Sequence, residues 1–527
     1  MADLLLPPDI VPNDVEFGIV DGTAVAQSPT VLTVRTANTY GNRVLGCRLA
    51  WRNLRTSQRA QLESFIATMR GRANRLFLND ASHALRGSMP TAELLANNTF
   101  GNGTTGWTGS GDFLLSVADR VLRATRNGMS ATSSVFPSSG ATVVQYAPYV
   151  ARAMLRQGRG TFSTIGARIN ANSSYGGLGT YGLSTTLMVG DSATSASAGI
   201  QNGATSGESA GDYVLVPFIS FARCGLVDNS PNLLLRSDEF DNASWTKTAS
   251  SITANSATDP FGTATADFLV ENGATAEHYV SQTVTVPSTA TDYCVAVFAK
   301  GNTRNFLRLQ LQENTGSTVL DQFFNLGTGA IGTNGTTGAN WANRRSFIVS
   351  YGNSWFLCFV IGRKTNAATS LTANVIAASA DGTSSYTGTN GANAINIFRA
   401  GLAASSMPFR AAQTTSASSS GSSQSGSGIY TKGWPVSTSG LLSVGDQVEL
   451  ITSQGSELKI VTASLNSDAA GQAYLQFEPG LRVAPADSAP VVVFNPMGKF
   501  MAVPDRIDWP TRPGRFSDFT LDLIEAP

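Results

Sequence analysis

The sequence is poor in charge and in histidine, and each shortage excludes a class of function. Charged residues make up only 14% of the 527 residues, with 36 basic and 36 acidic side chains. With no net charge, nothing in the composition favours nucleic acid or an anionic membrane as a partner. Two histidines, His83 and His278, leave little material for metal binding or general-base catalysis. We therefore expect no nucleic-acid partner and no metal centre.

Cysteines and long apolar runs are also scarce. No CxxC pair occurs, and each cysteine lies in an apolar stretch: Cys47, Cys224, Cys294 and Cys358. We expect small buried side chains rather than disulfides. No apolar run approaches the roughly 18 residues of a transmembrane helix, and MADLLLPPDIVPNDVEF lacks the features of a signal peptide. The sequence predicts a protein that is made in a cytoplasm and does not insert into a membrane.

What the sequence does contain is material for β-structure. Gly, Ser, Thr, Asn and Ala dominate, and 42% of the residues are hydrophobic, which is enough to build cores. The length exceeds the roughly 250–300 residues of a single core, so several domains are expected. Short alternating segments such as HYVSQTVTV and DYCVAVFAK favour antiparallel β-sandwiches. The predicted fold class is mainly β.

One segment has the periodicity of a helix. In TSQRAQLESFIATMRG the apolar residues recur at i, i+3, i+4 and i+7: Leu62, Phe65, Ile66 and Met69. This spacing predicts a helix over residues 57–70, with Thr56 or Ser57 as the N-cap. The preceding RVLGCRLAW alternates instead, which predicts a strand with one buried face: Leu45, Cys47, Leu49 and Trp51. Residues 1–90 thus form a sheet with one helix that lacks a closing partner.

The sequence contains a repeat. AELLANNTFGNGTTGWT (92–108) and PNLLLRSDEFDNASWTKT (231–248) match, with Leu94 opposite Leu234 and Phe100 opposite Phe240. Further on, ISFARCGL (219–226) matches INIFRAGL (395–402). We infer two related sandwich modules whose ends lie close together, so that each can be inserted into a host domain. Three tryptophans of the motif strands are expected in the cores: Trp107, Trp245 and Trp355.

The repeat and one linker divide the chain. TTSASSSGSSQSGSG (414–428) has no apolar anchor and is typical of a flexible linker. We assign residues 1–90 to the first part of a scaffold, 91–228 and 229–412 to the two modules, 413–428 to the linker, and 429–527 to the second part of the scaffold.

Residues 231–410 resemble the carbohydrate-binding-type jelly-roll modules of phage tail and capsid-decoration proteins. The shared segments are NLLLRSDEFDNASWTKT, FGTATADFLVENGATAEHYVSQTVTV, YCVAVFAK, SWFLCFVIG and ADGTSSYTGTNGANAINIFRAGLAASS. The chain departs from the family at Ser354–Trp355, where a glycine usually precedes the tryptophan, and at Phe398–Arg399, where tryptophan-glycine is usual. The resemblance implies a β-sandwich and leaves a shared ligand open.

The flanking segments resemble the distal tail protein of long-tailed phages. They are LPPDIVPNDVEFGIV, LAWRNLRTSQRAQLESFIATMRGRANRLFLND, TKGWPVSTSGLLSVGDQVEL, FEPGLRVAPADSAPVVVFNPMGKF and RPGRFSDFTLDLIEA. The resemblance implies a composite β-barrel/sandwich scaffold with one α-helix, interrupted by two tandem jelly-roll modules. It also implies a hexameric ring at the distal end of the tail in the virion, joining the tail tube protein to the baseplate hub and tail fibre proteins. Deleting about 91–413 is expected to leave a soluble domain that still forms rings.

Sugar binding needs exposed aromatic rings with amide or guanidinium groups nearby, because sugars offer apolar faces and many hydroxyls. The candidates lie in glycine-rich or polar stretches: Tyr175, Tyr181, Trp341, Asn343, Arg345 and Tyr386. Each aromatic ring among them has an alternative role as a cap on a sandwich edge.

Catalysis has weaker support. A glycoside hydrolase needs two carboxylates roughly 5–9.5 Å apart, and the acidic residues here lie mostly in turns. We predict no catalytic residue and no cofactor, and a structural calcium stays open because jelly-roll modules often hold one. The favoured hypothesis is a tail-tip adaptor that adsorbs the phage to a host-surface glycan. The alternatives are a tail-associated glycan-degrading enzyme and a purely structural decoration that binds no sugar.

Overall fold

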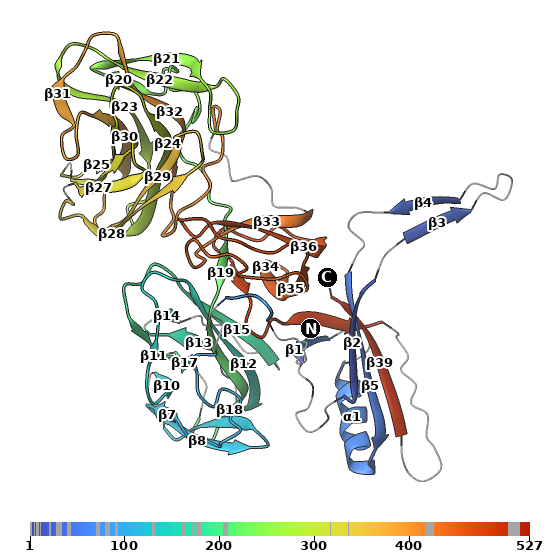
Figure 1. Cartoon of the computed structure of the whole chain (residues 1–527). Coiled ribbons are helices and arrows are strands. Elements are labelled where there is room, and N and C mark those ends of the chain that lie inside the picture. The colour runs from blue at the N-terminus through green and yellow to red at the C-terminus, as the bar shows by residue number, and fades with distance from the viewer. Residues whose placement is uncertain are drawn as a thin grey trace.

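The chain forms four β-rich bodies, which we name the end sheet, the barrel, the first sandwich and the second sandwich (Figure 1). The computed structural model describes residues 3–4, 6, 10, 12–20, 23–27, 34–38, 44–69, 74–79, 85–89, 93–128, 132–160, 162, 164–170, 172–173, 181–203, 209–316, 318–335, 337–417, 426–503 and 517–526. Within these ranges the fold is mainly β with one helix, as the sequence predicts.

The end sheet joins the two ends of the chain. Its strands, in spatial order, are β1 (Asp3–Leu4), β6 (Arg75–Leu78), β38 (Gly498–Ala502), β39 (Ser517–Glu525), β5 (Val44–Leu54) and β2 (Asp14–Val20). The last strand, β39, pairs with β5 from the partners Ser517 and Leu54 to Ile524 and Gly46. The C-terminal strands therefore complete a sheet that the N-terminal segment begins. A hairpin of β3 (Thr23–Gln27) and β4 (Val34–Asn38) projects away from this sheet (Figure 1).

The helix α1 (Thr56–Met69) covers one face of the end sheet. Its predicted apolar residues are buried, and so is the predicted face of β5: Leu62, Phe65, Ile66, Met69, Leu45, Cys47, Leu49 and Trp51. The ring of Trp51 lies 5.7 Å from that of Phe519 on the last strand, so both chain ends share one core. Among the described residues no helix is long and apolar enough to cross a membrane.

The N-cap of α1 differs from the prediction. Arg55, rather than Thr56 or Ser57, precedes the first helical residue, and its carbonyl accepts the first helical hydrogen bond from Arg59 at 2.9 Å. The side chain of Gln58 accepts the N–H of Arg55 at 3.1 Å, in the manner of a capping box. The reason is that β5 runs to Leu54, which leaves a single residue between the strand and the helix.

The barrel is closed by a strand from the middle of the chain. Its strands, in order, are β19 (Gly225–Val227), β33 (Gly426–Lys432), β36 (Ala473–Leu481), β35 (Gly455–Val461), β34 (Gln447–Thr452) and β37 (Pro490–Val492). β19 pairs with both β33 and β37, so it closes the ring of strands. The barrel packs on the end sheet, where the N–H of Leu458 donates to the Glu525 carboxylate at 2.7 Å.

The first sandwich consists of two five-stranded sheets and a short pair around one core. One sheet has β14 (Asn172–Ser173), β13 (Ile165–Ile169), β17 (Ala198–Asn202), β10 (Ser133–Pro137) and β7 (Trp107–Ser110). The other has β15 (Tyr181–Met188), β12 (Tyr149–Arg159), β18 (Tyr213–Arg223), β9 (Val121–Arg126) and β8 (Phe113–Ala118). The pair is β11 (Ala141–Thr142) with β16 (Ser195–Ala196).

The second sandwich also encloses a core between two antiparallel sheets. One has β20 (Thr246–Thr248), β23 (Thr275–Thr285), β30 (Ser370–Ala378), β25 (Phe306–Glu313), β26 (Val319–Asn325) and β27 (Ala330–Asn334), with β31 (Ser385–Thr387) beside β23. The other has β21 (Ser250–Ala257), β22 (Ala266–Glu271), β32 (Ala392–Ala403), β24 (Thr291–Gly301), β29 (Phe356–Lys364) and β28 (Trp341–Ser350). Trp107, Trp245 and Trp355 are core residues as predicted, and all four cysteines are buried and none is in a disulfide.

The two sandwiches begin with the same hydrogen-bond pattern. The alignment that this pattern gives is shifted by one residue from the alignment of the two sequences. The N–H of Leu94 donates to Phe221, and the N–H of Leu233 donates to Leu402. The indole N–H of Trp107 donates to the carbonyl of Asn97, and that of Trp245 to the carbonyl of Arg236; both acceptor residues have positive φ. Leu95 thus corresponds to Leu234, while Leu94 corresponds to Leu233.

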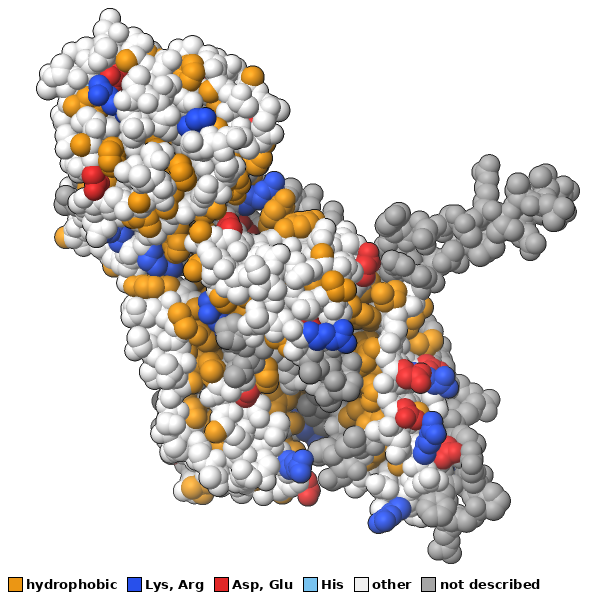
Figure 2. Space-filling view, in the orientation of Figure 1, with side chains coloured by type: hydrophobic (Ala, Val, Ile, Leu, Met, Phe, Trp, Pro, Cys, Tyr) orange, Lys and Arg blue, Asp and Glu red, His pale blue; other side chains and the backbone are white. Residues whose placement is uncertain are grey.

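The closing strands differ more from the expected match. Phe221 and Leu402 occupy equivalent positions by their hydrogen bonds, although the sequence match places Leu226 opposite Leu402. Leu226 instead lies in β19 of the barrel. Few charged side chains appear on the face shown in Figure 2, and acidic and basic groups mix over the end sheet, where Arg52 lies 2.8 Å from Asp14.

Candidate functional site

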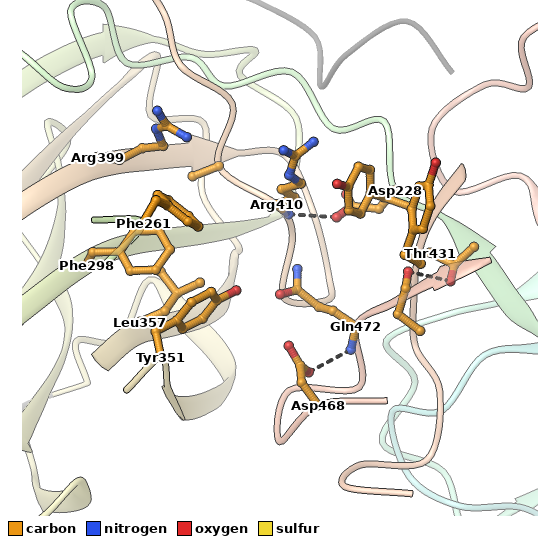
Figure 3. A pocket seen from close by; sticks show the side chains of 14 residues that line it. Asp228, Phe261, Phe298, Tyr351, Leu357, Arg399, Arg410, Thr431, Asp468 and Gln472 are labelled. Atoms are coloured by element: carbon orange, nitrogen blue, oxygen red, sulfur yellow. Dashed lines mark hydrogen bonds between the residues drawn. The ribbon is translucent and has the colours of Figure 1, made fainter. Parts of the chain in front are cut away.

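A cleft with a volume of about 300 Å³ lies between the second sandwich and the barrel (Figure 3). Phe261, Phe298 and Tyr351 line it from the second sandwich, and Tyr430 and Tyr474 line it from the barrel. Its two walls therefore belong to different bodies of the fold.

The wall on the second sandwich is a cluster of aromatic rings in edge-to-face contact. The ring of Phe261 lies 5.8 Å from Phe298 and 6.3 Å from Tyr351, and the rings of Phe298 and Tyr351 are 4.8 Å apart. Phe298 is buried, whereas Phe261 is 59% exposed. An aromatic ring that is held by its neighbours and still open to solvent is a suitable platform for the apolar face of a ligand.

The turn between β21 and β22 holds Phe261 in place through Asp259. One carboxylate oxygen of Asp259 accepts the N–H of Phe261 at 2.7 Å and the N–H of Thr263 at 3.0 Å. The other accepts the hydroxyls of Thr263 and Thr265. Burial raises the pKa of Asp259, but these hydrogen bonds outweigh it and bring the pKa down to about 2. The turn is thus rigid around an ionised carboxylate.

The wall on the barrel is aromatic, and an arginine from the segment that connects the second sandwich to the barrel stacks against it. The rings of Tyr430 and Tyr474 lie 4.7 Å apart, and Tyr474 is 47% exposed. The guanidinium carbon of Arg410 lies 4.0 Å from the centre of the Tyr430 ring, which is within the range of a cation–π interaction.

Two polar groups lie side by side at the edge of the barrel. The Asp468 carboxylate accepts the backbone N–H groups of Ala470 at 2.8 Å and Gln472 at 2.9 Å. Burial raises the pKa of Asp468, and burial together with nearby Asp468 raises the pKa of Tyr351 to about 12. The side-chain nitrogen of Gln472 is buried without a hydrogen-bond partner among the described residues. Such a group favours a ligand or a water that can accept its hydrogen bond.

A buried ionic network holds Asp228, one of the residues that line the cleft. Lys432 Nζ lies 2.9 Å from Asp487 and 3.6 Å from Asp228, and it donates to the Ser230 hydroxyl at 2.6 Å. The Asp228 carboxylate also accepts the backbone N–H of Arg410 at 2.6 Å. Because Asp228 and Arg410 belong to the two segments that connect the second sandwich to the barrel, the network holds the two bodies together.

Trp341, Asn343, Arg345 and Tyr386, the predicted sugar-binding residues whose side chains are described, do not line this cleft, and the expectation that Trp341 lies on an exposed loop is wrong. Trp341 begins β28, is 5% exposed, and donates its indole N–H to the Thr318 carbonyl at 3.3 Å within the core. Asn343 lies on the same strand at positive φ, where the pairing with β29 shifts register. This bulge interrupts the alternation that identifies a strand, so the segment resembles a loop in the sequence.

Arg345 and Tyr386 are engaged in internal contacts. The Arg345 guanidinium lies 4.4 Å from the Tyr146 ring centre and donates to the Ser406 carbonyl, and burial lowers its pKa. The Tyr386 hydroxyl donates to Glu271 at 2.7 Å, while its ring lies 4.7 Å from that of His278. Both residues hold parts of the fold together.

The other predicted residues fall partly outside the described ranges. Tyr175 and His83 lie outside the described residues. Tyr181 is the first residue of β15, and only its backbone is described. His278 is buried, and one ring nitrogen lies 2.7 Å from the Ala249 carbonyl, so it is hydrogen-bonded inside the sandwich.

The sequence carries one signal for the cleft, in the turn that holds Phe261. The stretch DPFGT places an aromatic residue in a turn with an Asp two residues before it, which is the pattern of an Asx turn. No comparable signal marks Tyr474, which alternates with core residues on β36.

No group of three or more His, Cys, Asp or Glu side chains that could hold a metal ion occurs within the described part of the chain. The turn carboxylate of Asp259 is occupied by hydrogen bonds from Phe261, Thr263 and Thr265.

Comparisons with known proteins add little. No protein-family model matches the chain, and no curated protein matches it. Among solved structures, it is similar to the CBM22-1–CBM22-2 tandem domain of Xyn10C from Paenibacillus barcinonensis, with 10% identity and a TM-score of 0.22 over 60% of this chain and 98% of that one. It is also similar to the enzymatically active domain of tailspike protein 4 of bacteriophage CBA120, with 16% identity and a TM-score of 0.22 over 33% of this chain and 21% of that one. TM-scores this low carry no conclusion about function.

Proposed function

We propose that this chain is a non-catalytic structural subunit at the distal end of a phage tail, and that it binds a host-surface glycan in the cleft between the second sandwich and the barrel. The observation that carries the glycan-binding part is the pair of aromatic walls, with the Asp468 carboxylate and the side-chain amide of Gln472 beside them, whose nitrogen has no hydrogen-bond partner among the described residues. This combination suits a ligand with apolar faces and many hydroxyls.

The tail assignment is supported by the sequence resemblance and by the pairing of both chain ends in one sheet. A scaffold built from the two ends can carry guest units between them without interruption of its own core. In the proposed assembly, six copies form a ring through the end sheet and the barrel, in contact with the tail tube, baseplate hub and tail fibre proteins. Several copies of a weak site in one ring bind a cell surface by avidity.

The test uses the purified full-length chain. Mass measurement in solution is expected to give a hexamer, and a monomer at every concentration would remove support for the ring. Binding to surface polysaccharide of the host is expected for the wild type and is expected to weaken in Phe261→Ala. Val444→Ala is the matched control, because Val444 is an exposed apolar residue of the barrel that does not line the cleft.

A glycan-degrading enzyme is the second candidate, because two carboxyl groups, Asp228 and Asp468, line one cleft and burial raises the pKa of both. Against it, Asp228 is 3% exposed and is held by Lys432 and the N–H of Arg410. Release of reducing ends from the polysaccharide, lost in Asp468→Asn, would establish the enzyme. Absence of any polysaccharide binding would favour a purely structural decoration.

A further inference from the structure

We propose that the cleft binds a single neutral pyranose residue at the end of a glycan, held between the second sandwich and the barrel so that the sugar spans both bodies. The inference rests on the proposed glycan binding and specifies the ligand of the same site. Four properties of the cleft lead to it.

The charges of the lining favour a neutral ligand. Two arginines and two aspartates line the cleft, and Arg399 is already paired with Asp238 at 2.7 Å. Asp228 is in turn held by Lys432. The Asp468 carboxylate is desolvated and accepts the neutral backbone N–H groups of Ala470 and Gln472, so an anionic sugar beside it adds like-charge repulsion.

The two aromatic walls favour a pyranose ring. Phe261 and Tyr351 line the cleft from the second sandwich, and Tyr430 and Tyr474 line it from the barrel strands β33 and β36. A pyranose offers C–H groups on both faces, so that one ring can contact both walls.

The polar groups suit vicinal hydroxyls. The side-chain nitrogen of Gln472 is a donor that has no partner in the part of the chain that the structure describes, and the Asp468 carboxylate accepts the backbone N–H of the same Gln472. A sugar hydroxyl both donates and accepts, so two neighbouring hydroxyls can satisfy the donor and the acceptor together.

The size of the cleft favours a terminal residue. A volume of about 300 Å³ is at the lower end of the range of about 300–1,000 Å³ for ligand pockets. A cleft at this end of the range has room for a single sugar ring rather than for several in a row.

The test is calorimetric titration of the full-length chain with methyl glycosides of glucose, galactose, mannose and N-acetylglucosamine, and with galacturonic acid as the charged counterpart. At least one neutral glycoside is expected to bind. If methyl galactoside binds, galacturonic acid is expected to bind at least fivefold more weakly than it does. Gln472→Ala, Gln472→Glu and Phe261→Ala are each expected to weaken binding about tenfold, the loss of one hydrogen bond or one stacking contact. Val444→Ala is expected to bind as the wild type does.

Circular dichroism and the unfolding midpoint verify that each variant is folded. If the host polysaccharide binds but none of the neutral glycosides does, the inference is overturned while the proposed function stands. Unchanged affinity in Gln472→Ala and Phe261→Ala overturns the inference in the same way. If neither the polysaccharide nor any glycoside binds, the proposed function and the inference both fall.

Discussion

At the scale of single residues, the Asp259 carboxylate beside the cleft makes the stability of the fold depend on pH. Its folded pKa of about 2 lies below the ordinary value near 3.8. A lowered pKa means that the carboxylate stabilises the fold above about pH 4, and that this contribution is lost as the pH falls through 2. Asp259→Asn is therefore expected to lower the free energy of unfolding by about 2 kcal/mol at pH 7.

Urea unfolding at pH 7 and at pH 3 measures the effect of Asp259→Asn, and the difference from wild type is expected to shrink at pH 3. Asp119→Asn is the control, because Asp119 is an exposed turn residue with φ of 51° and is expected to change stability by less than about 0.5 kcal/mol. An equal difference at both pH values would contradict the assigned role of the ionised carboxylate.

Arg152 joins the first sandwich to the barrel. Its guanidinium lies 2.5 Å from the Glu449 carboxylate and donates to the carbonyls of Phe494 and Asn495, and both charged side chains are fully buried. Arg152→Met leaves an uncompensated buried carboxylate, so a loss of about 3–5 kcal/mol is expected. The double variant Arg152→Met/Glu449→Leu is expected to recover much of it in the same urea assay.

The exposed pair Arg52–Asp14 provides the control for Arg152, since its side chains are 68% and 44% exposed. Arg52→Met is expected to cost less than about 1 kcal/mol. A double variant that is less stable than Arg152→Met alone would show that the ion pair is not the source of the loss.

At the scale of elements, each sandwich begins with a side-chain acceptor that ties its entering segment to its closing strand. Glu93 accepts the N–H groups of Leu95 at 3.1 Å and Phe221 at 2.9 Å, and Asn232 accepts those of Leu234 at 3.1 Å and Leu402 at 3.0 Å. Burial raises the pKa of Glu93 despite these hydrogen bonds. A raised pKa means that the stability contributed by Glu93 falls as the pH rises from about 4.5 through the folded value.

Glu93→Gln keeps an acceptor oxygen and removes the desolvated charge. Its stability relative to wild type is therefore expected to increase between pH 4 and pH 7, as measured by thermal unfolding. Asn232→Asp is the reciprocal change. It is expected to destabilise the second sandwich at neutral pH, because the carboxylate faces the carbonyls of Ala400 and Ala412 that Asn232 now donates to. A relative stability of Glu93→Gln that decreases with pH would refute the assignment.

The same elements show what a sequence can predict. The helix and the buried face of β5 follow from side-chain periodicity alone, because each is a local pattern. The register of the repeat does not, since Leu233–Leu235 offers three leucines to match two, and only the backbone hydrogen bonds decide between the alignments. The cleft was beyond prediction because its walls come from Phe261 and Tyr474, which are brought together by the docking of two separately folded bodies.

At the scale of the whole molecule, β19 decides how the chain can be divided. Deletion of 91–413 was expected to leave a ring-forming domain, yet it removes Gly225–Val227, which pairs with β33 and β37 and closes the barrel. Without β19, two barrel strands have unpaired edges, which favour aggregation. The deletion is therefore expected to give an insoluble product.

Removal of the second sandwich alone leaves all strands of the barrel in the chain. Replacing residues 232–413 with a short glycine-serine linker keeps β19 in the chain and Lys432 beside Asp228 and Asp487. Because the end sheet and the barrel have cores of their own, this variant is expected to stay soluble, to keep the oligomeric mass of the full chain, and to lose glycan binding with one wall of the cleft. Light scattering and polysaccharide binding measure both properties on one sample.

A variant of unchanged mass that still binds the polysaccharide would place the glycan site outside the cleft. A variant that dissociates into monomers would place the ring contacts in the second sandwich.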